Sequence, residues 1–243
     1  MKTALDPSRD SPSVHVAAPA RRRGADRTGA GGAPRERVSA RERLLAAADE
    51  LFYEGGIHTV GIDRVIERAG VAKASLYDTF GSKDALIRAY LEARHDARKA
   101  RLTAWLERYE TPRERLLGVF DAMADLMKGK NFRGCAFTRA GSEAPPTSGV
   151  RGACEQARHW MRELFTGIGR DAGLDGARAD ALAVQLCMLY DGASVMGQIE
   201  GNAKPASAAK EAAAVLFDQA LKPATAPSRH ERDAVRKQRP RAA

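Results

Sequence analysis

Apolar residues recur at helical spacing through the middle of the chain. Between residues 39 and 221 they return every three or four positions, and almost no stretch alternates with the two-residue period of a strand. A first helical stripe consists of Leu44, Ala48, Leu51 and Phe52. A second marks a long helix over about residues 83–109 through Leu86, Tyr90, Leu91, Leu102, Trp105 and Leu106. The pattern predicts an all-α fold.

Capping residues and glycines place the later helices. Thr111 precedes a proline at the first helical position and a glutamate three residues after the cap, which is a strong helix start. Further helices are expected over about residues 149–172, 177–200 and 207–221, separated by Gly173, Gly176, Gly201 and Pro205.

The predicted helix 177–200 is apolar nearly all round, so both of its sides should be buried. One side can face the core and the other a second subunit, where Ala193 and Gly197 allow close approach. The helix 207–221 supplies a second apolar stripe. We therefore expect a homodimer with a four-helix interface, and core packing in a monomer is the alternative.

Both ends of the chain are polar and basic. Residues 1–38 and 222–243 are rich in Pro, Gly, Ser, Ala and Arg and contain almost no large apolar residue, so we expect a disordered basic arm and a disordered basic tail. The net charge is +9, from 40 Lys and Arg against 31 Asp and Glu, and its excess lies in these two segments. Arg21, Arg22 and Arg23 are candidates to add contacts with nucleic-acid phosphates, and the alternative is a solvated arm or a start codon assigned too far upstream.

Several protein classes are disfavoured. Cys135, Cys154 and Cys187 are widely spaced, which argues against a disulfide scaffold and against a cysteine metal site. The apolar region 181–199 is interrupted by polar residues, and the first residues form no continuous apolar run, so we expect neither a membrane protein nor a secreted one, but a cytoplasmic protein. No hydrolase elbow, zinc-protease motif or Walker loop is found, so we expect no enzyme and no cofactor.

The stretch 56–86, GIHTVGIDRVIERAGVAKASLYDTFGSKDAL, predicts two short helices at an angle. Residues 62–69 form the first, Gly70 and Val71 a tight turn, and residues 73–80 the second. Gly70 suits a position of positive φ, while Val71 and Leu76 can fill the corner. This is a helix-turn-helix pattern, although an ordinary helical corner is the alternative. A helix of two turns is narrow enough to enter the major groove of DNA.

At these residues the chain resembles the TetR family of transcriptional regulators. The resemblance lies in Ala69-Gly70-Val71, Ser75-Leu76-Tyr77, Phe80, Ser82-Lys83 and Leu86, after a helix that ends Leu51-Phe52-Tyr53-Glu54-Gly55-Gly56. It implies about nine helices: a three-helix DNA-binding head over residues 39–85 and an effector-binding and dimerisation body over residues 86–221. The implied partners are a double-stranded DNA operator, a small-molecule effector and a second copy of the chain.

The resemblance also implies DNA contacts. Tyr77 and Lys83 would hold phosphates, and Ser75 with Lys73 would face the groove. Two positions depart from the family, since Gly61 stands where a threonine is frequent and Thr79 where a histidine is frequent. Asp78 either accepts from a cytosine amino group or is a solvated residue at the groove rim. The candidate DNA-binding residues are Gly61, Lys73, Ala74, Ser75, Tyr77, Thr79 and Lys83.

A mainly apolar effector pocket is expected between the body helices. The candidate apolar lining is Trp105, Phe120, Met123, Phe137, Trp160 and Met188, with His159, Gln185 and Asp191 as polar candidates. Ordinary core packing is the alternative for each of these residues. We expect a repressor that a small, mainly apolar effector releases from a palindromic operator. The alternatives are a repressor that senses electrophiles or oxidants through Cys135, and an architectural DNA-binding protein without a ligand.

Overall fold

The computed structural model describes residues 38–223, which form nine α-helices and no strand. The helices are α1 (Ala40–Gly55), α2 (Ile62–Ala69), α3 (Lys73–Phe80), α4 (Lys83–Leu106), α5 (Pro112–Met127), α6 (Ala136–Glu143), α7 (Gly149–Asp171), α8 (Gly176–Glu200) and α9 (Lys204–Leu221). The all-α prediction is confirmed. The predicted arm up to residue 37, and the tail from residue 224, lie outside the described residues.

Local sequence explains most of the helix starts. Ser39 with Glu42 and Thr111 with Glu114 each form a capping box, in which side chain and backbone satisfy each other reciprocally. Ser82, Ser148 and Asp175 cap α4, α7 and α8 with single side-chain hydrogen bonds. The prediction of a capped helix start at Thr111 is confirmed.

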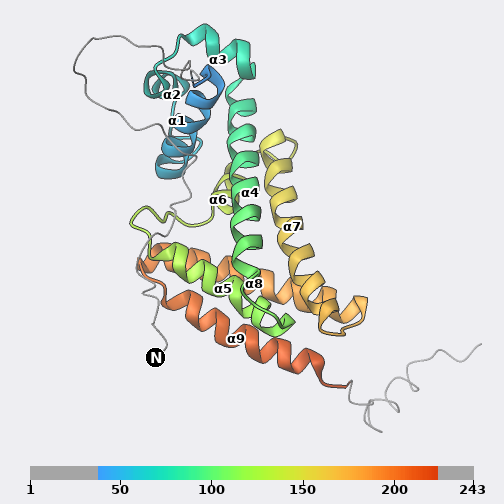
Figure 1. The fold of residues 1–243 in the computed structure, drawn as a ribbon. Helices are drawn as coiled ribbons and strands as arrows, with labels where there is room; N and C mark the ends of the chain where they lie inside the picture. The colour runs from blue at the N-terminus through green and yellow to red at the C-terminus, as the bar shows by residue number, and fades with distance from the viewer. Residues whose placement is uncertain (1–37, 224–243) are drawn as a thin grey trace, which may run out of the picture.

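α4 joins the two parts of the molecule. It begins beside the head formed by α1, α2 and α3 and descends to the level where α5, α8 and α9 lie, with α7 alongside it (Figure 1). Its first turns, including Leu86 and Leu91, belong to the head core, and its last turns, including Leu102 and Leu106, belong to the body core. One rigid element therefore touches both parts.

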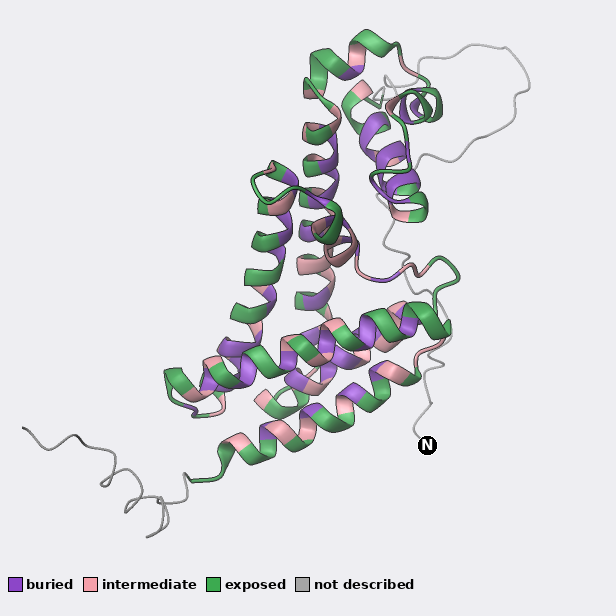
Figure 2. Ribbon diagram, turned by 180° about the vertical axis from the view of Figure 1, so that it is seen from behind, coloured by how far each residue is buried: buried purple, intermediate pink, exposed green. Residues whose placement is uncertain are grey.

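In the head and in the body, the buried residues lie on the sides of the helices that face one another (Figure 2). The head core is closed below by α6 and by the start of α7, through Ala140, Val150 and Cys154. A buried ion pair ties the head to α4, because Arg94 Nε donates to Asp49 Oδ1 at 2.5 Å and both side chains are at most 10% exposed.

Three expectations need correction. α6 was not predicted, and it has no side-chain cap. α9 begins at Lys204 and not near residue 207, because Pro205 lies in its first turn, where a missing N–H costs nothing. α4 ends at Leu106, three residues earlier than expected.

Candidate functional site

The helix-turn-helix forms as the sequence predicts. Gly70 ends α2 in the left-handed conformation, with φ 63° and ψ 43°. The N–H of Val71 donates to the carbonyl of Ile66, which closes the turn. Leu76 is completely buried, so it holds α3 against the rest of the head and leaves the opposite side of α3 open.

The predicted DNA-contacting residues gather around this open side. Lys73, Ala74, Tyr77 and Thr79 on α3 are exposed, as is Gly61 at the start of α2, while Ser75 and Lys83 are half-buried. Lys83 is the first residue of α4, beside the N–H groups that Ser82 leaves free, and such a helix start attracts phosphate.

Two of these side chains are engaged within the head. Lys73 Nζ donates to Asp63 Oδ1 at 3.0 Å, and this hydrogen bond raises the pKa of Lys73. The Thr79 hydroxyl donates to the carbonyl of Ser75 at 2.6 Å. The ammonium of Lys73 is therefore held by Asp63 within the head, whereas the side chain of Tyr77 lies exposed.

A cavity of about 370 Å³ lies between the end of α1, α4, α5, α8 and the segment that joins α5 to α6. We refer to it as the α5-side cavity. Its apolar lining includes Met123, Leu126, Phe132 and Phe137. Its polar lining includes three arginines of α4 at positions 94, 98 and 101.

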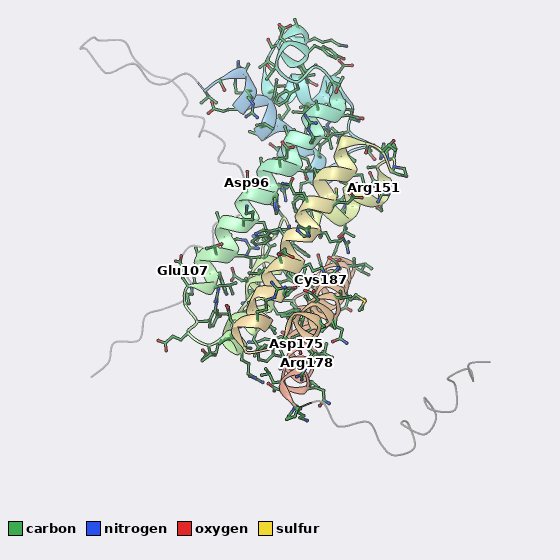
Figure 3. The ribbon with its side chains drawn as sticks, turned by 90° about the vertical axis from the view of Figure 1, so that its right-hand side faces the viewer. Asp96, Glu107, Arg151, Asp175, Arg178 and Cys187 are labelled. Atoms are coloured by element: carbon green, nitrogen blue, oxygen red, sulfur yellow. The ribbon has the colours of Figure 1, made fainter. Side chains whose placement is uncertain are left out.

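A second cavity, of about 330 Å³, lies between α4, α6, α7 and α8, and we refer to it as the α7-side cavity. The three cysteine thiols line this cavity. Asp191 also lines it and forms an ion pair with Arg158 at 2.9 Å. Figure 3 shows Cys187 on α8 and Arg151 near the start of α7. Among the described residues, no group of three His, Cys, Asp or Glu is placed to hold a metal ion. The two cavities share Arg98, Cys135, Phe137 and Tyr190.

Tyr53 connects the α5-side cavity to the head that carries the helix-turn-helix. This residue lies in the last turn of α1 and lines the cavity. Its hydroxyl donates to the carbonyl of Gly134 at 3.1 Å and accepts from the N–H of Arg133 at 3.0 Å. Arg139 of α6 donates to the Tyr53 carbonyl at 2.8 Å. Tyr53 of α1 therefore holds the segment between α5 and α6 through its hydroxyl, and holds α6 through its backbone carbonyl.

Comparisons with known proteins agree with this architecture. The family model described as bacterial regulatory proteins, tetR family, matches residues 44–90, from α1 into α4. The chain is 32% identical over 172 residues to the HTH-type transcriptional activator FasR of Mycolicibacterium smegmatis, and the match spans 69% of this chain and 77% of FasR. The chain belongs to the TetR family of transcriptional regulators. Family membership confirms the prediction of a DNA-binding regulator that is not an enzyme.

Two further proteins match different shares of this chain. The HTH-type transcriptional repressor NemR of Escherichia coli is 30% identical over 105 residues, which span 42% of this chain and 53% of NemR. The crystal structure of a TetR-family regulator from Streptomyces coelicolor has a TM-score of 0.70 at 32% identity and covers 75% of this chain and 96% of its own. Since one relative is an activator and another a repressor, family membership alone leaves the sign of regulation open. No helix among residues 38–223 is long and apolar enough to cross a membrane.

The structure separates the predicted effector residues into three groups. Met123, Phe137 and Asp191 line a cavity of this TetR-family regulator. Neither cavity is lined by Trp105, Phe120 or Trp160. Phe120 is fully buried in the body core, and the two tryptophans are half-buried against the same core. His159, Gln185 and Met188 are exposed and also line neither cavity. The structure therefore places these last six residues outside both cavities.

Sequence reasoning also missed residues that the structure brings to the cavities. The arginines of α4 were not among the candidate residues, although their spacing of four and three residues places them on one side of a helix. Tyr53 and Tyr190 were missed because an aromatic residue at helical spacing is ordinarily a core residue. Tyr53 and Tyr190 line a cavity only because α6 and α8 pack close to α1 and α4 in the folded chain.

Proposed function

We propose that this chain is a repressor that binds a palindromic operator as a homodimer and leaves it when a ligand occupies the α5-side cavity. One observation carries the proposal: a residue of the DNA-binding head, Tyr53, lines a cavity of the body. A ligand there touches the head and α4 together, so it can favour one arrangement of the head over another. Only such a difference in affinity can shift the population.

The route from the cavity to DNA is short. A ligand that displaces Phe132 or Gly134 moves the segment that holds the Tyr53 hydroxyl. Asp49 and Arg94 transmit the same displacement between α1 and α4. In a dimer, tilting both heads changes the distance between the two α3 helices, which must lie about 34 to 36 Å apart to enter successive major grooves.

An exposed apolar surface on α8 and α9 supports the dimer. Met188 and Ile199 on α8 are 62% and 75% exposed, and Val215 on α9 is 68% exposed. The other exposed apolar residues of this surface are Val184, Val195, Met196 and Leu221. A surface of this kind is typical of a subunit interface. Met188, predicted to line the effector pocket, is reassigned to this interface.

Sedimentation of an Ile199→Asp variant tests the dimer. The unaltered chain should sediment as a dimer and the variant as a monomer, because a carboxylate would be buried in an apolar interface. Val38→Asp is the control, since Val38 is also exposed but lies before α1. A variant Ile199→Asp that remains a dimer would remove this interface from the proposal.

The DNA-binding and repression steps need two assays. Selection from random double-stranded DNA, followed by footprinting, should give a protected palindrome. A reporter gene placed behind that palindrome should be silenced by the chain and restored by a cavity ligand. Activation of the reporter by the unliganded chain would replace repression with activation and leave the DNA-binding assignment intact.

A second candidate function uses Cys135. This thiol lines both cavities, stands at the N-cap of α6 and is half-buried. Burial raises the pKa values of Cys154 and Cys187 to about 11, which makes both poor nucleophiles at neutral pH. We expect N-ethylmaleimide to alkylate Cys135 first, in peptide mass spectrometry, and the adduct to weaken operator binding. Equal labelling of all three thiols, or undiminished operator binding by the Cys135 adduct, would argue against this function.

A further inference from the structure

Three arginines of α4 reach the α5-side cavity, and only one of them is neutralised. Arg94 pairs with Asp49. The ion pairs among the described residues include neither Arg98 nor Arg101. A guanidinium stays charged at all ordinary pH values, so the lining of this cavity holds two positive charges that form no ion pair among the described residues.

Both guanidinium groups are held in place by neutral partners. Arg98 Nη2 donates to the carbonyl of Ala157 at 2.7 Å and to His95 Nδ1 at 3.3 Å, and its guanidinium lies 4.4 Å from the ring centroid of Phe137. Arg101 Nη1 donates to the carbonyl of Ala122 at 3.2 Å. These contacts fix the positions of the charges but do not cancel them.

Each of these arginines also keeps an unused donor. The Nε atoms of Arg98 and Arg101 are shielded from solvent and have no hydrogen-bond acceptor. A buried donor without an acceptor is costly, and a buried charge without a counter-charge is more costly still. An anionic group in the cavity would supply the missing counter-charge to both guanidinium groups. Asp191, on the other cavity, already pairs with Arg158.

The lining also has an apolar part, beside polar residues that include Lys130 and Ser194. Met123 and Leu126 of α5 and the rings of Phe132 and Phe137 surround the same space. We propose that the α5-side cavity binds an amphipathic anion, with a carboxylate or phosphate on Arg98 and Arg101 and an apolar body against α5 and the two phenylalanines. This inference rests on the proposed function, since it names the ligand class of the same cavity, and it revises the expectation of a mainly apolar effector.

Calorimetry on the full chain without DNA tests the charge requirement. The probes are decanoate, decyl phosphate and decan-1-ol, which share one apolar chain and differ in the headgroup. At least one anion should bind roughly 10-fold or more tightly than the alcohol, because hydrogen bonds between charged groups contribute more to binding than those of a hydroxyl. The tighter anion identifies the headgroup. An alcohol that binds as tightly as both anions would overturn the proposal.

Substitutions on α4 test the two arginines. Arg98→Met and Arg101→Met should each weaken the better anion roughly 10-fold or more and leave decan-1-ol unchanged. Arg88→Met is the matched control, because Arg88 lies on the same helix but is exposed and pairs with Glu92. Undiminished anion binding by both folded variants would overturn the proposal. If neither variant folds, as judged by circular dichroism, the comparison of the three ligands on the unaltered chain decides.

The same probes separate this proposal from the proposed function. An anion that needs Arg98 for binding but leaves operator affinity unchanged would keep the ligand class and refute release by ligand. A neutral ligand that releases the operator as effectively as the anions would keep release by ligand and refute the anionic class.

Discussion

Tyr53→Phe removes one hydroxyl from the contact between the cavity and the DNA-binding head. In the unaltered chain this hydroxyl accepts a hydrogen bond from the N–H of Arg133 and donates one to the carbonyl of Gly134. The phenylalanine keeps the ring on which Arg94 stacks, 3.7 Å from the ring centroid. The substitution therefore loosens the segment between α5 and α6 from α1 and leaves the buried ion pair of Arg94 with Asp49 in place.

The size of the effect follows from the two lost hydrogen bonds. Each contributes about 0.5 to 1.5 kcal/mol net, so unfolding should become easier by about 1 to 3 kcal/mol. For a chain of this size this corresponds to a melting temperature lower by about 2 to 12 °C. If the contact carries the coupling between ligand and DNA, a loss of about 1.4 kcal/mol of coupling would reduce the ligand response roughly tenfold.

Fluorescence anisotropy of labelled operator DNA measures the response with and without saturating decanoate. The unaltered chain should lose affinity on adding decanoate, by roughly 5- to 150-fold for a typical coupling. Tyr53→Phe should bind the operator with nearly unchanged affinity in the absence of ligand, but should respond less. Tyr109→Phe is the control, because Tyr109 packs against Gly118 and lines neither cavity.

The reasoning would be refuted by a Tyr53→Phe variant that melts at a lower temperature yet responds to decanoate as fully as Tyr109→Phe does. Its hydroxyl would then stabilise the fold without transmitting the ligand signal.

Three further predictions concern stability and DNA contact. Asp49→Asn should destabilise the chain by about 3 kcal/mol or more in urea unfolding, because it leaves Arg94 buried without a counter-charge. Asp218→Asn is the control, since it breaks an exposed ion pair and should cost far less stability. Equal losses in the two variants would contradict this prediction. Lys83→Ala should weaken binding to every DNA sequence alike and lower the slope of log affinity against log salt by roughly 1, while a loss confined to the selected palindrome would assign Lys83 to base reading. Burial, with help from Arg98 and Lys99, lowers the pKa of His95 from its ordinary 6.5. Unfolding therefore binds a proton, and the free energy of unfolding should fall as the pH drops below 6.5. His95→Gln should flatten this pH dependence, and an unchanged slope between about pH 5 and 8 would exclude His95 as its source.

The parts of the fold that could be predicted are those encoded by neighbouring residues. Thr111 with Glu114 and Gly70 with Val71 act within one turn of the chain, so their structures can be read from the sequence. α6 could not be predicted, because its eight residues have no side-chain cap and Arg139 holds them by reaching Tyr53, 86 positions earlier. Its existence depends on tertiary contacts.

The ligand site was harder to predict for the same reason. An arginine on a helix is ordinarily solvated, and nothing near Arg98 in the sequence shows that Ala157 and Phe137 will enclose it. Met188 and Phe120 have apolar side chains at helical spacing, which suits a pocket, a core and an interface equally. The structure assigns Phe120 to the core and exposes Met188.

Reciprocity between ligand and operator tests the central claim most directly. Decanoate should be titrated into the chain alone and into its complex with the selected operator, and operator binding should be measured with and without decanoate. The account predicts that the operator weakens decanoate binding by the same factor by which decanoate weakens operator binding. Decanoate that binds with one affinity, whether or not the operator is bound, would contradict it.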